Sequence, residues 1–269
     1  MQHQINTARS HRMNAQEAFE RFFVPARRQP TETEQIILAQ AEVSSISSSL
    51  PPLTLFSWGA GSTVLLVHGW GGCAAQLTAF VPPLVNLGYR VLACDLPAHG
   101  QTAGKQTNAF EFAAAIQAIA AQQGKFDAII AHSWGAAATI MALSEASIAG
   151  KVVCLSAACW LSSAVRMIAK LLRLSSETEV ELCQLFERQF GEDVWQRASA
   201  NLRATHLGIP GLLFHDRHDR KIAYAESEAI AQSWTSAQLI ATSGLGHEHI
   251  LHDPDVIAQT AAFIQSAMP

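Results

Sequence analysis

The sequence predicts an α/β fold in which helices cover both faces of a mostly parallel, doubly wound sheet. Short apolar stretches of strand type alternate with longer stretches of helical periodicity, and parallel strands need such crossover connections. Two of these strands also run directly into loops of small residues, after Val67 and after Ala131. The expected strands lie near residues 53–57, 63–67, 90–94, 127–131, 151–155, 209–214 and 237–241.

Length and composition fit one domain with a substantial core. A chain of 269 residues with 49% hydrophobic content can bury such a core without disulfides or metals. The formal net charge of −4 gives no basic field, so we expect a small-molecule substrate and no nucleic-acid partner. The 5 cysteines form no Cys-x-x-Cys pair and are expected to be reduced, packed thiols.

No export or membrane segment is expected. Residues 1–6 are polar, which predicts no secretory signal and a cytoplasmic location. The most apolar long window, 152–172, is interrupted by polar residues that include Arg166 and Lys170, and this argues against a membrane span.

Ser133 ends an apolar strand and begins an alanine-rich helix. The run Ile129-Ile130-Ala131-His132-Ser133-Trp134-Gly135 places small residues two positions before and after the serine. A strand that turns sharply into a helix needs small neighbours, and the turn exposes the corner hydroxyl. The pattern indicates a nucleophile elbow with Ala131 in place of the usual first glycine, although an ordinary strand-to-helix turn gives a similar string.

A glycine-rich loop follows the strand of residues 63–67, in the run His68-Gly69-Trp70-Gly71-Gly72. Acyl transfer builds negative charge on a carbonyl oxygen, which backbone N–H groups stabilise. We expect these donors to be the amides of Trp134, directly after the nucleophile, and of Trp70. The simpler alternative is a tight turn that glycine permits. His68 is expected to support the loop rather than to react.

With these two motifs the chain resembles the α/β-hydrolase family over about residues 50–265. A third segment, 91–102, is similar to the family's strand followed by Asp-x-Pro-x-His-Gly-x-Ser, with Ala98 and Thr102 as mild departures. The resemblance implies that Asp95 and His99 in this segment are structural. It also implies a hydrolase of the serine type with a catalytic acid and a histidine later in the chain.

A serine hydroxyl needs a base, and the base needs an anion that orients it. In the family the acid follows a later strand, and the segment His215-Asp216-Arg217-His218-Asp219 offers two carboxylates. The family spacing selects Asp219, and Asp216 is expected to form the turn. The loop after the preceding strand, 156–159, contains no carboxylate.

The base is expected to be His247, in the run Gly244-Leu245-Gly246-His247, because the family carries its histidine in such a loop. His249 and His252 lie farther along, at or within the expected final helix. The three histidines also raise the alternative of a metal site, since imidazole is a common zinc ligand. Neither cysteines nor paired carboxylates support that alternative, so we expect no metal and no cofactor.

A helical insertion is expected between the strands near 151–155 and 209–214. An amphipathic helix over 161–172 and a second helix over 177–190 fall where the family places a cap, and Trp160 and Trp195 are candidates to shape an apolar pocket. Packing helices alone would give the same periodicity. The expected domains are therefore a core of residues 51–156 and 207–269 and a cap of residues 157–206.

Residues 1–50 carry no recognisable chemistry. Helices are possible over 15–23 and 31–41, and 44–49 has the character of a loop or an edge strand. This N-terminal extension is expected to pack on the core, to contribute to an oligomer contact or to be partly mobile.

These observations predict a serine hydrolase that cleaves an ester or thioester of a small, largely apolar substrate through an acyl-enzyme. Ser133 in place of aspartate excludes a haloalkane dehalogenase. Two alternatives stay open: an amidase or aminopeptidase, which is expected to need a larger, more acidic cap, and a non-catalytic binding protein of the same fold. The sequence leaves the substrate-binding residues and the oligomeric state open.

Overall fold

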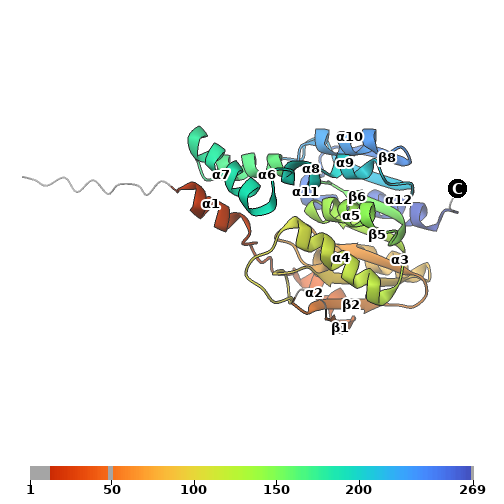
Figure 1. Ribbon diagram of the computed structural model, residues 1–269. Helices are drawn as coiled ribbons and strands as arrows, with labels where there is room; N and C mark the ends of the chain where they lie inside the picture. The colour runs from red at the N-terminus through yellow and green to blue at the C-terminus, as the bar shows by residue number, and fades with distance from the viewer. Residues whose placement is uncertain (1–12, 48–50, 268–269) are drawn as a thin grey trace, which may run out of the picture.

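The computed structural model describes residues 13–47 and 51–267, so the expectation about residues 1–6 lies outside the described residues. An eight-stranded sheet forms the centre of the molecule, in the order β1-β2-β4-β3-β5-β6-β7-β8 (Figure 1). Its strands are β1 (Glu42–Ile46), β2 (Leu53–Trp58), β3 (Thr63–Val67), β4 (Arg90–Asp95), β5 (Phe126–His132), β6 (Ala149–Leu155), β7 (Gly211–Asp216) and β8 (Ala237–Thr242).

The sheet is parallel from β4 to β8 in spatial order, and the predicted fold class is confirmed. The two strands at the β1 edge are antiparallel to their neighbours. The seven expected strands lie within two residues of the observed bounds. β1 is an edge strand over 42–46, which settles part of the 44–49 expectation, while 48–50 lie outside the described residues.

Helices cover both faces of the sheet and bury its central strands. β5 and β6 read as nearly continuous apolar runs because neither face of a covered parallel strand meets water. One face packs against α4 (Ala109–Gln123), α5 (Trp134–Glu145), α9 (Ala200–Ala204) and α10 (Tyr224–Ser233). The other packs against the 3-10 helix η1 (Ala74–Phe80), α3 (Val81–Asn86) and α12 (Pro254–Gln265). Helix α2 (Glu32–Leu38) contacts η1, and the short helix α11 (Gly246–His249) lies beside β7.

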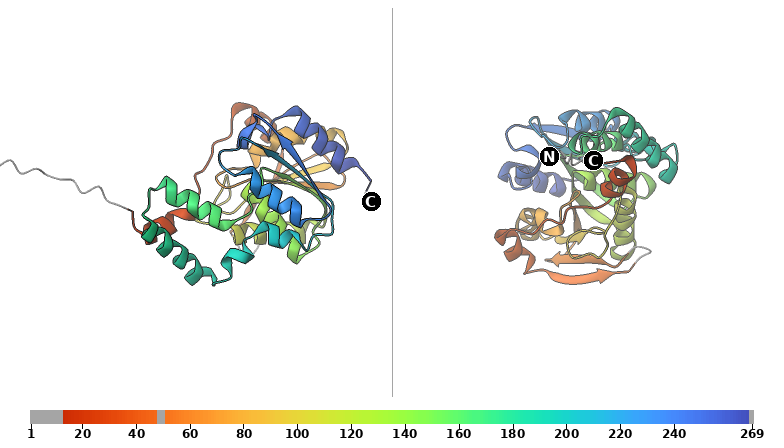
Figure 2. Two further views of the ribbon diagram at one scale, coloured as in Figure 1. Left: turned by 90° about the horizontal axis from the view of Figure 1, so that it is seen from above. Right: turned by 90° about the vertical axis from the view of Figure 1, so that its left-hand side faces the viewer.

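Helices α6 (Leu161–Leu171), α7 (Ser176–Phe190) and α8 (Val194–Arg197) follow β6 and precede α9. α6 and α7 pack with α1 (Ala15–Phe22) into a separate apolar cluster, and Figures 1 and 2 show these three helices beside one another at one end of the sheet. α1 begins at a capping box, because the Asn14 side chain accepts from the Glu17 amide and the Glu17 carboxylate accepts from the Asn14 amide.

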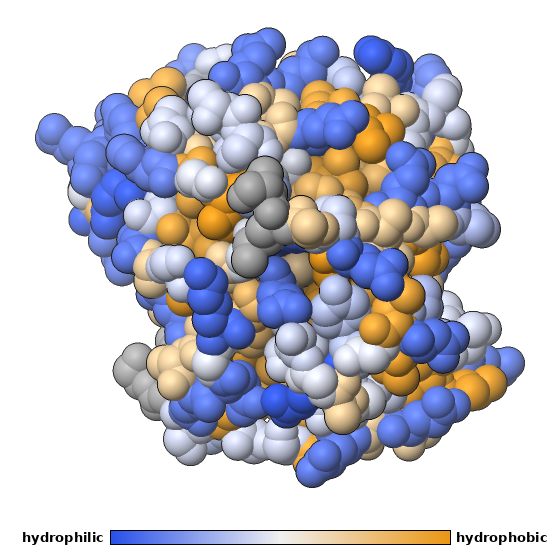
Figure 3. Space-filling model, turned by 90° about the vertical axis from the view of Figure 1, so that its right-hand side faces the viewer, coloured by the Kyte–Doolittle hydropathy of each residue, from blue (hydrophilic) through white to orange (hydrophobic). Residues whose placement is uncertain are grey.

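The opposite end of the molecule presents mainly hydrophilic residues, with hydrophobic residues between them (Figure 3). Within residues 13–47 and 51–267, every helix is too short or too polar to cross a bilayer. The cysteines are free, as expected, and four of the five are buried.

Candidate active site

Ser133 lies at the turn between β5 and α5, where the sequence predicts an elbow. Its backbone has φ 53° and ψ −124°, a strained conformation for a residue other than glycine. A Cβ atom on Gly135 would lie 2.2 Å from the His68 carbonyl oxygen, so only glycine fits there. The turn explains why small residues flank the serine.

The structure brings Ser133, His247 and Asp219 together in one hydrogen-bonded chain. His247 Nε2 lies 3.1 Å from Ser133 Oγ, and His247 Nδ1 lies 2.7 Å from Asp219 Oδ2. With Nδ1–H donating to the carboxylate, the Nε2 lone pair faces the serine hydroxyl. Gly244 and Gly246 in the loop before His247 have φ values of 90° and 62°, which glycine adopts without strain. This arrangement can remove a proton from Ser133.

The Asp219 carboxylate is fixed by several donors. Its Oδ1 accepts hydrogen bonds from the amides of Lys221 (2.8 Å) and Ile222 (3.0 Å). The fully buried His215 ring places Nε2 3.4 Å from Oδ2. Burial alone raises the pKa of the Asp219 carboxyl, but the hydrogen bonds from His215 and His247 outweigh it and hold this pKa well below its usual range. Asp219 is therefore an anion at neutral pH.

Asp216 has the turn-forming position expected for it. Its Oδ1 accepts from the His218 amide at 2.9 Å, and its Oδ2 accepts from the Leu245 amide at 2.8 Å and from Thr242 Oγ1 at 3.0 Å. Burial opposes ionisation of Asp216, yet these bonds bring the pKa of its carboxyl below the usual value. The side chain ties the loop after β7 to the loop after β8.

Two buried histidines beside the three residues were not identified from the sequence. His132 Nε2 lies 3.0 Å from the His247 carbonyl oxygen, and the two rings are 4.6 Å apart. Burial, and then the nearby His247, holds the pKa of His132 well below the ordinary value, so its ring stays neutral. His215 accepts a hydrogen bond from Ser227 Oγ (2.6 Å). The sequence gave no signal that either histidine lies near the site. The contact of His132 joins segments far apart in the chain, and His215 lies within the buried strand β7.

The glycine-rich loop after β3 lies against the nucleophile. A Cβ atom on Gly69 would be 2.8 Å from Ser133 Cβ, so the loop passes as close as backbone allows. His68 ties this loop to the end of β4, since its Nδ1 lies 2.7 Å from the Gly69 carbonyl oxygen and its Nε2 accepts from the Leu96 amide at 3.0 Å. Trp70 and Trp134, the expected sources of the oxyanion donors, line the same pocket as Ser133.

Asp95 at the end of β4 and His99 in the following segment, for which the resemblance implies a structural role, bond the backbone of neighbouring loops. Asp95 accepts from the Ala74 and Gln101 amides, each at 2.7 Å, and His99 Nε2 accepts from the Gly71 amide at 2.8 Å. Ala98, where glycine is common in the resembled pattern, has a left-handed φ of 61°. The segment therefore braces the glycine-rich loop rather than the nucleophile.

His249 ends the short helix α11, and His252 lies directly before the N-cap of the final helix α12, so neither histidine lies within that helix. Asp253 caps α12 and sets its start two residues beyond His252. Within the part of the chain that the structure describes, no cluster of three or more His, Cys, Asp or Glu residues has the arrangement of a metal site.

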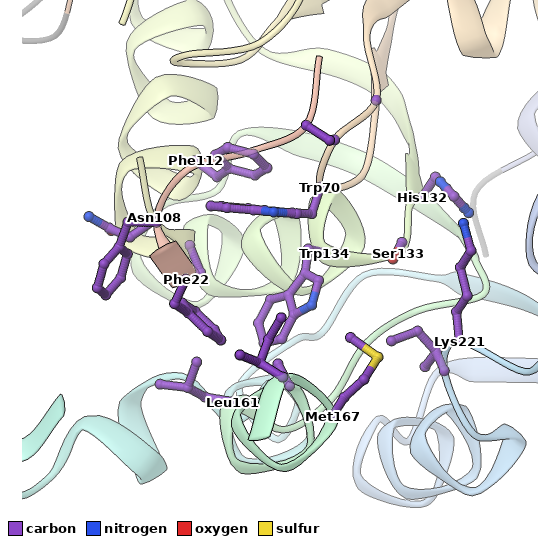
Figure 4. A pocket seen from close by; sticks show the side chains of 18 of the residues that line it. Phe22, Trp70, Asn108, Phe112, His132, Ser133, Trp134, Leu161, Met167 and Lys221 are labelled. Carbon is purple, nitrogen blue, oxygen red and sulfur yellow. The ribbon is translucent and has the colours of Figure 1, made fainter. Parts of the chain in front are cut away.

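A pocket of about 490 Å³ opens at Ser133 (Figure 4). Apolar side chains from the N-terminal extension, the core and the inserted helices form most of its lining, and polar residues lie at both ends, with Lys221 near Ser133 and Asn108 near Phe22. The lining includes Phe22, Phe23, Trp70, Phe110, Phe112, Trp134, Leu161, Ala164, Met167, Ile168, Phe186 and Phe190, together with Arg28, Gln76, Asn108, Lys221 and Glu248.

The inserted helices reach this pocket through residues other than those the sequence singled out. Trp160 Nε1 donates to Asn201 Oδ1 at 3.2 Å, and Trp195 Nε1 donates to Glu187 Oε1 at 2.8 Å. Both rings brace the insertion internally, and neither belongs to the pocket lining. Phe22 and Phe23 of the N-terminal extension line the pocket instead, although that region carries no motif.

Comparisons with known structures agree with this fold. Structures of similar fold include an esterase of Pyrococcus furiosus, with 20% identity, a TM-score of 0.67 and coverage of 92% of this chain and 99% of that chain. A membrane phospholipase A described as a bacterial virulence factor has 14% identity, a TM-score of 0.67 and coverage of 87% and 90%. The thioesterase domain of the curacin biosynthetic pathway has 17% identity, a TM-score of 0.62 and coverage of 84% and 99%.

A search of curated protein sequences gave no match. Residues 64–260 match the sequence pattern described as the alpha/beta hydrolase family. This match covers most of the chain and includes the loops that carry Ser133, Asp219 and His247. The chain belongs to the alpha/beta hydrolase family.

Proposed function

We propose that this hydrolase is a serine esterase or thioesterase that acts on a small, largely apolar substrate through an acyl-enzyme. The observation that carries the proposal is the continuous chain from Ser133 through His247 to Asp219, at distances of 3.1 and 2.7 Å. It opens on a pocket whose walls are mainly apolar. Neutral acyl groups fit such walls, because few polar groups there would lose hydrogen bonds to water.

In the proposed reaction Ser133 Oγ attacks the substrate carbonyl carbon while His247 Nε2 takes the hydroxyl proton. The amides of Trp70 and Trp134 stabilise the oxyanion, and Asp219 stabilises the imidazolium. The C–O or C–S bond then breaks, and His247 gives its proton to the leaving alkoxide or thiolate. Water then attacks the acyl-serine while His247 takes a proton from it. The bond to Ser133 Oγ breaks, the acid leaves, and His247 returns the proton to Ser133.

We also propose a role for the inserted segment. Residues 157–206 form a small cap over a core of residues 51–156 and 207–269, with residues 1–50 as an extension that reaches the same pocket. Support comes from the pocket lining, which draws on α6 and α7 as well as on the core loops. A cap of this kind shields the acyl-enzyme from bulk water.

The test is labelling with a fluorophosphonate, which reacts with activated serines. The wild-type protein should be labelled once, at Ser133, and Ser133→Ala should not be labelled. A panel of esters, thioesters and amides then identifies the bond that is cleaved. A wild-type protein that is neither labelled nor active on any of the three would favour a non-catalytic binding protein.

A further inference from the structure

The pocket at Ser133 has two ends of different chemistry. At the mouth, the side chains of Lys221 and Glu248 are 59% and 55% exposed and form an ion pair of 2.6 Å. Phe22 lies at the other end (Figure 4), and ring contacts connect it to four further phenylalanines that line the pocket. We call these buried or half-buried rings the aromatic end: Phe22, Phe23, Phe110, Phe186 and Phe190. The pocket therefore has an exposed ion pair at one end and a group of phenylalanine rings, with Asn108 beside them, at the other.

The reacting residues lie beside the mouth. Lys221 follows Asp219 by two residues, and Glu248 is adjacent to His247, so the ion pair joins the loops that carry the acid and the base. Figure 4 shows Ser133, His132 and Lys221 on one side, and Phe22 and Asn108 on the other. Trp70 and Trp134 lie between these two groups.

This placement determines the direction in which a substrate must lie in the pocket in order to react. The leaving group must face His247, because the imidazole supplies the proton that the leaving group takes. His247 lies on the mouth side, in contact with the His132 ring. The acyl group therefore points the other way, past Trp70 and Trp134 toward the aromatic end.

Phe22 occupies the point where this path meets the N-terminal helix. Its ring centroid lies 6.5 Å from that of Trp70 and 4.9 Å from that of Phe186 on α7. The next residue, Phe23, continues the row with Phe190 at 5.7 Å. Helix α1 is held there by Ala15 and Ala18, which are buried against the inserted helices. The ring of Phe22 thus bridges the glycine-rich loop side of the pocket and α7.

We propose that the pocket binds the acyl part of the substrate as an extended, unbranched hydrocarbon chain, and that Phe22 sets the chain length that fits. This inference rests on the proposed serine-hydrolase function. The N-terminal extension is then a specificity element, because α1 supplies the ring that limits the path. A row of flat rings favours a narrow, flexible chain over a branched or bulky acyl group.

The expected signature is a chain-length dependence. Burial of one methylene group contributes about 0.8 kcal/mol, which corresponds to a rise of about fourfold in kcat/KM for each added carbon. The rise should stop when the chain reaches the aromatic end. The measurement uses p-nitrophenyl esters of straight-chain acids of increasing length, with a parallel series of alkyl acetates in which only the alcohol part grows.

Two substitutions at Phe22 should move the optimum in opposite directions. Phe22→Trp enlarges the ring and should shift the optimum to shorter acyl chains, whereas Phe22→Leu opens space and should shift it to longer ones. Gln16→Ala is the matched control, because Gln16 is exposed on α1 and its side chain donates to Glu20 along the same helix. Its profile should match that of the wild type. If Phe22→Trp fails to fold, the smaller Phe22→Leu tests the same point.

The outcomes separate this inference from the function on which it rests. A protein that fluorophosphonate does not label at Ser133 overturns the proposed function. A labelled and active protein with a flat acyl profile, or with one that both Phe22 variants leave unchanged, overturns only the role of Phe22 and the pocket. A rise along the alkyl acetate series in place of the acyl series overturns the assigned direction of binding.

Discussion

The catalytic edge of the sheet and the wall of the pocket are held together by different kinds of interaction. We use catalytic edge for the loops that carry the proposed catalytic residues Ser133, Asp219 and His247, and pocket wall for helices α1, α6 and α7. Along the edge, directional hydrogen bonds of 2.7–3.1 Å and a strained serine fix each atom. In the wall, aromatic rings pack with their centroids 4.9–6.3 Å apart and make few polar contacts.

This difference has a physical consequence for substitutions. A hydrogen-bonded chain depends on distance and angle, so the loss of one partner or a shift of one ångström should lower the reaction rate steeply. Apolar packing is not directional, and a wall of this kind can exchange one hydrophobic side chain for another at small cost. The edge should therefore govern the rate of reaction, and the wall should govern which substrate reacts.

The largest effect is expected at the base. His247→Ala removes the proton acceptor of Ser133, and loss of the histidine from such a triad lowers kcat by about 10⁶-fold. His249→Ala is the matched control, since His249 is an exposed histidine on the same short helix. Steady-state kinetics on one activated ester measures both. Near-normal kcat in His247→Ala would contradict the proposal that His247 is the base for Ser133.

The acid should follow with a smaller effect. Asp219→Asn keeps the shape of the side chain but removes the anion that orients His247, and the comparable change in a serine triad lowers kcat by about 10⁴-fold. Asp216→Asn is the comparison, because Asp216 bonds the Leu245 amide rather than His247. It should reduce kcat less and thermal stability more. A larger loss of kcat in Asp216→Asn than in Asp219→Asn would indicate that Asp216 is the acid.

The glycine beside the nucleophile tests the same edge without removing a polar group. In Gly69→Ala the new Cβ would lie 2.8 Å from Ser133 Cβ and displace the serine or the loop. A displacement of about 1 Å in a reacting group lowers rates by about 100-fold. Gly208→Ala is the control, since open space surrounds that position. Equal activity in the two variants would show that the edge tolerates displacement.

The sequence predicts the catalytic edge better than the pocket wall, for the same physical reason. A strained turn with Ser133 at its corner requires small residues at fixed spacing, so the local string carries the geometry. The loop with Asp219 likewise follows the buried strand β7, and the loop with His247 follows the half-buried edge strand β8, both of which the sequence places. The order of the sheet then brings these loops to one edge.

The wall could not be predicted because its contacts join segments with no shared pattern. Helix α1 is recognisable from its capping box at Asn14, but the sequence of residues 13–23 does not predict that Phe22 faces α7 rather than the sheet. The same limit explains the choice of Trp160 and Trp195 as pocket residues. The ring N–H groups of these tryptophans donate to Asn201 and Glu187 within the insertion, and neither ring lines the pocket.

The buried acid of the edge should also make stability depend on pH. The pKa of Asp219 is held below its unfolded value of about 4, so its ionised form stabilises the fold above that pH, and this contribution is lost as pH falls further. The free energy of unfolding should therefore decrease below about pH 5 more steeply in the wild type than in Asp219→Asn. Urea unfolding at several pH values measures the two slopes. Parallel slopes would mean that the hydrogen bonds to Asp219 do not favour its anion.

The smallest effect is expected where the edge meets the mouth of the pocket. Lys221 and Glu248 form a 2.6 Å ion pair, but both side chains are more than half exposed. Exposed pairs contribute about 0.2–1 kcal/mol and weaken with added salt. Lys221→Met, which keeps the apolar stem, and Glu248→Gln should each change kcat/KM by no more than about fivefold.

A double-mutant cycle on this pair, measured at low and at high salt, locates the border between the two regions. We expect a coupling energy below about 1 kcal/mol that decreases as salt is added, because water already screens the two charges. Such a result places the pair with the adaptable wall, although it joins the loops of Asp219 and His247. A larger coupling that salt leaves unchanged would place Lys221 and Glu248 within the directional edge, since only a pair that fixes the relative position of acid and base would behave in that way.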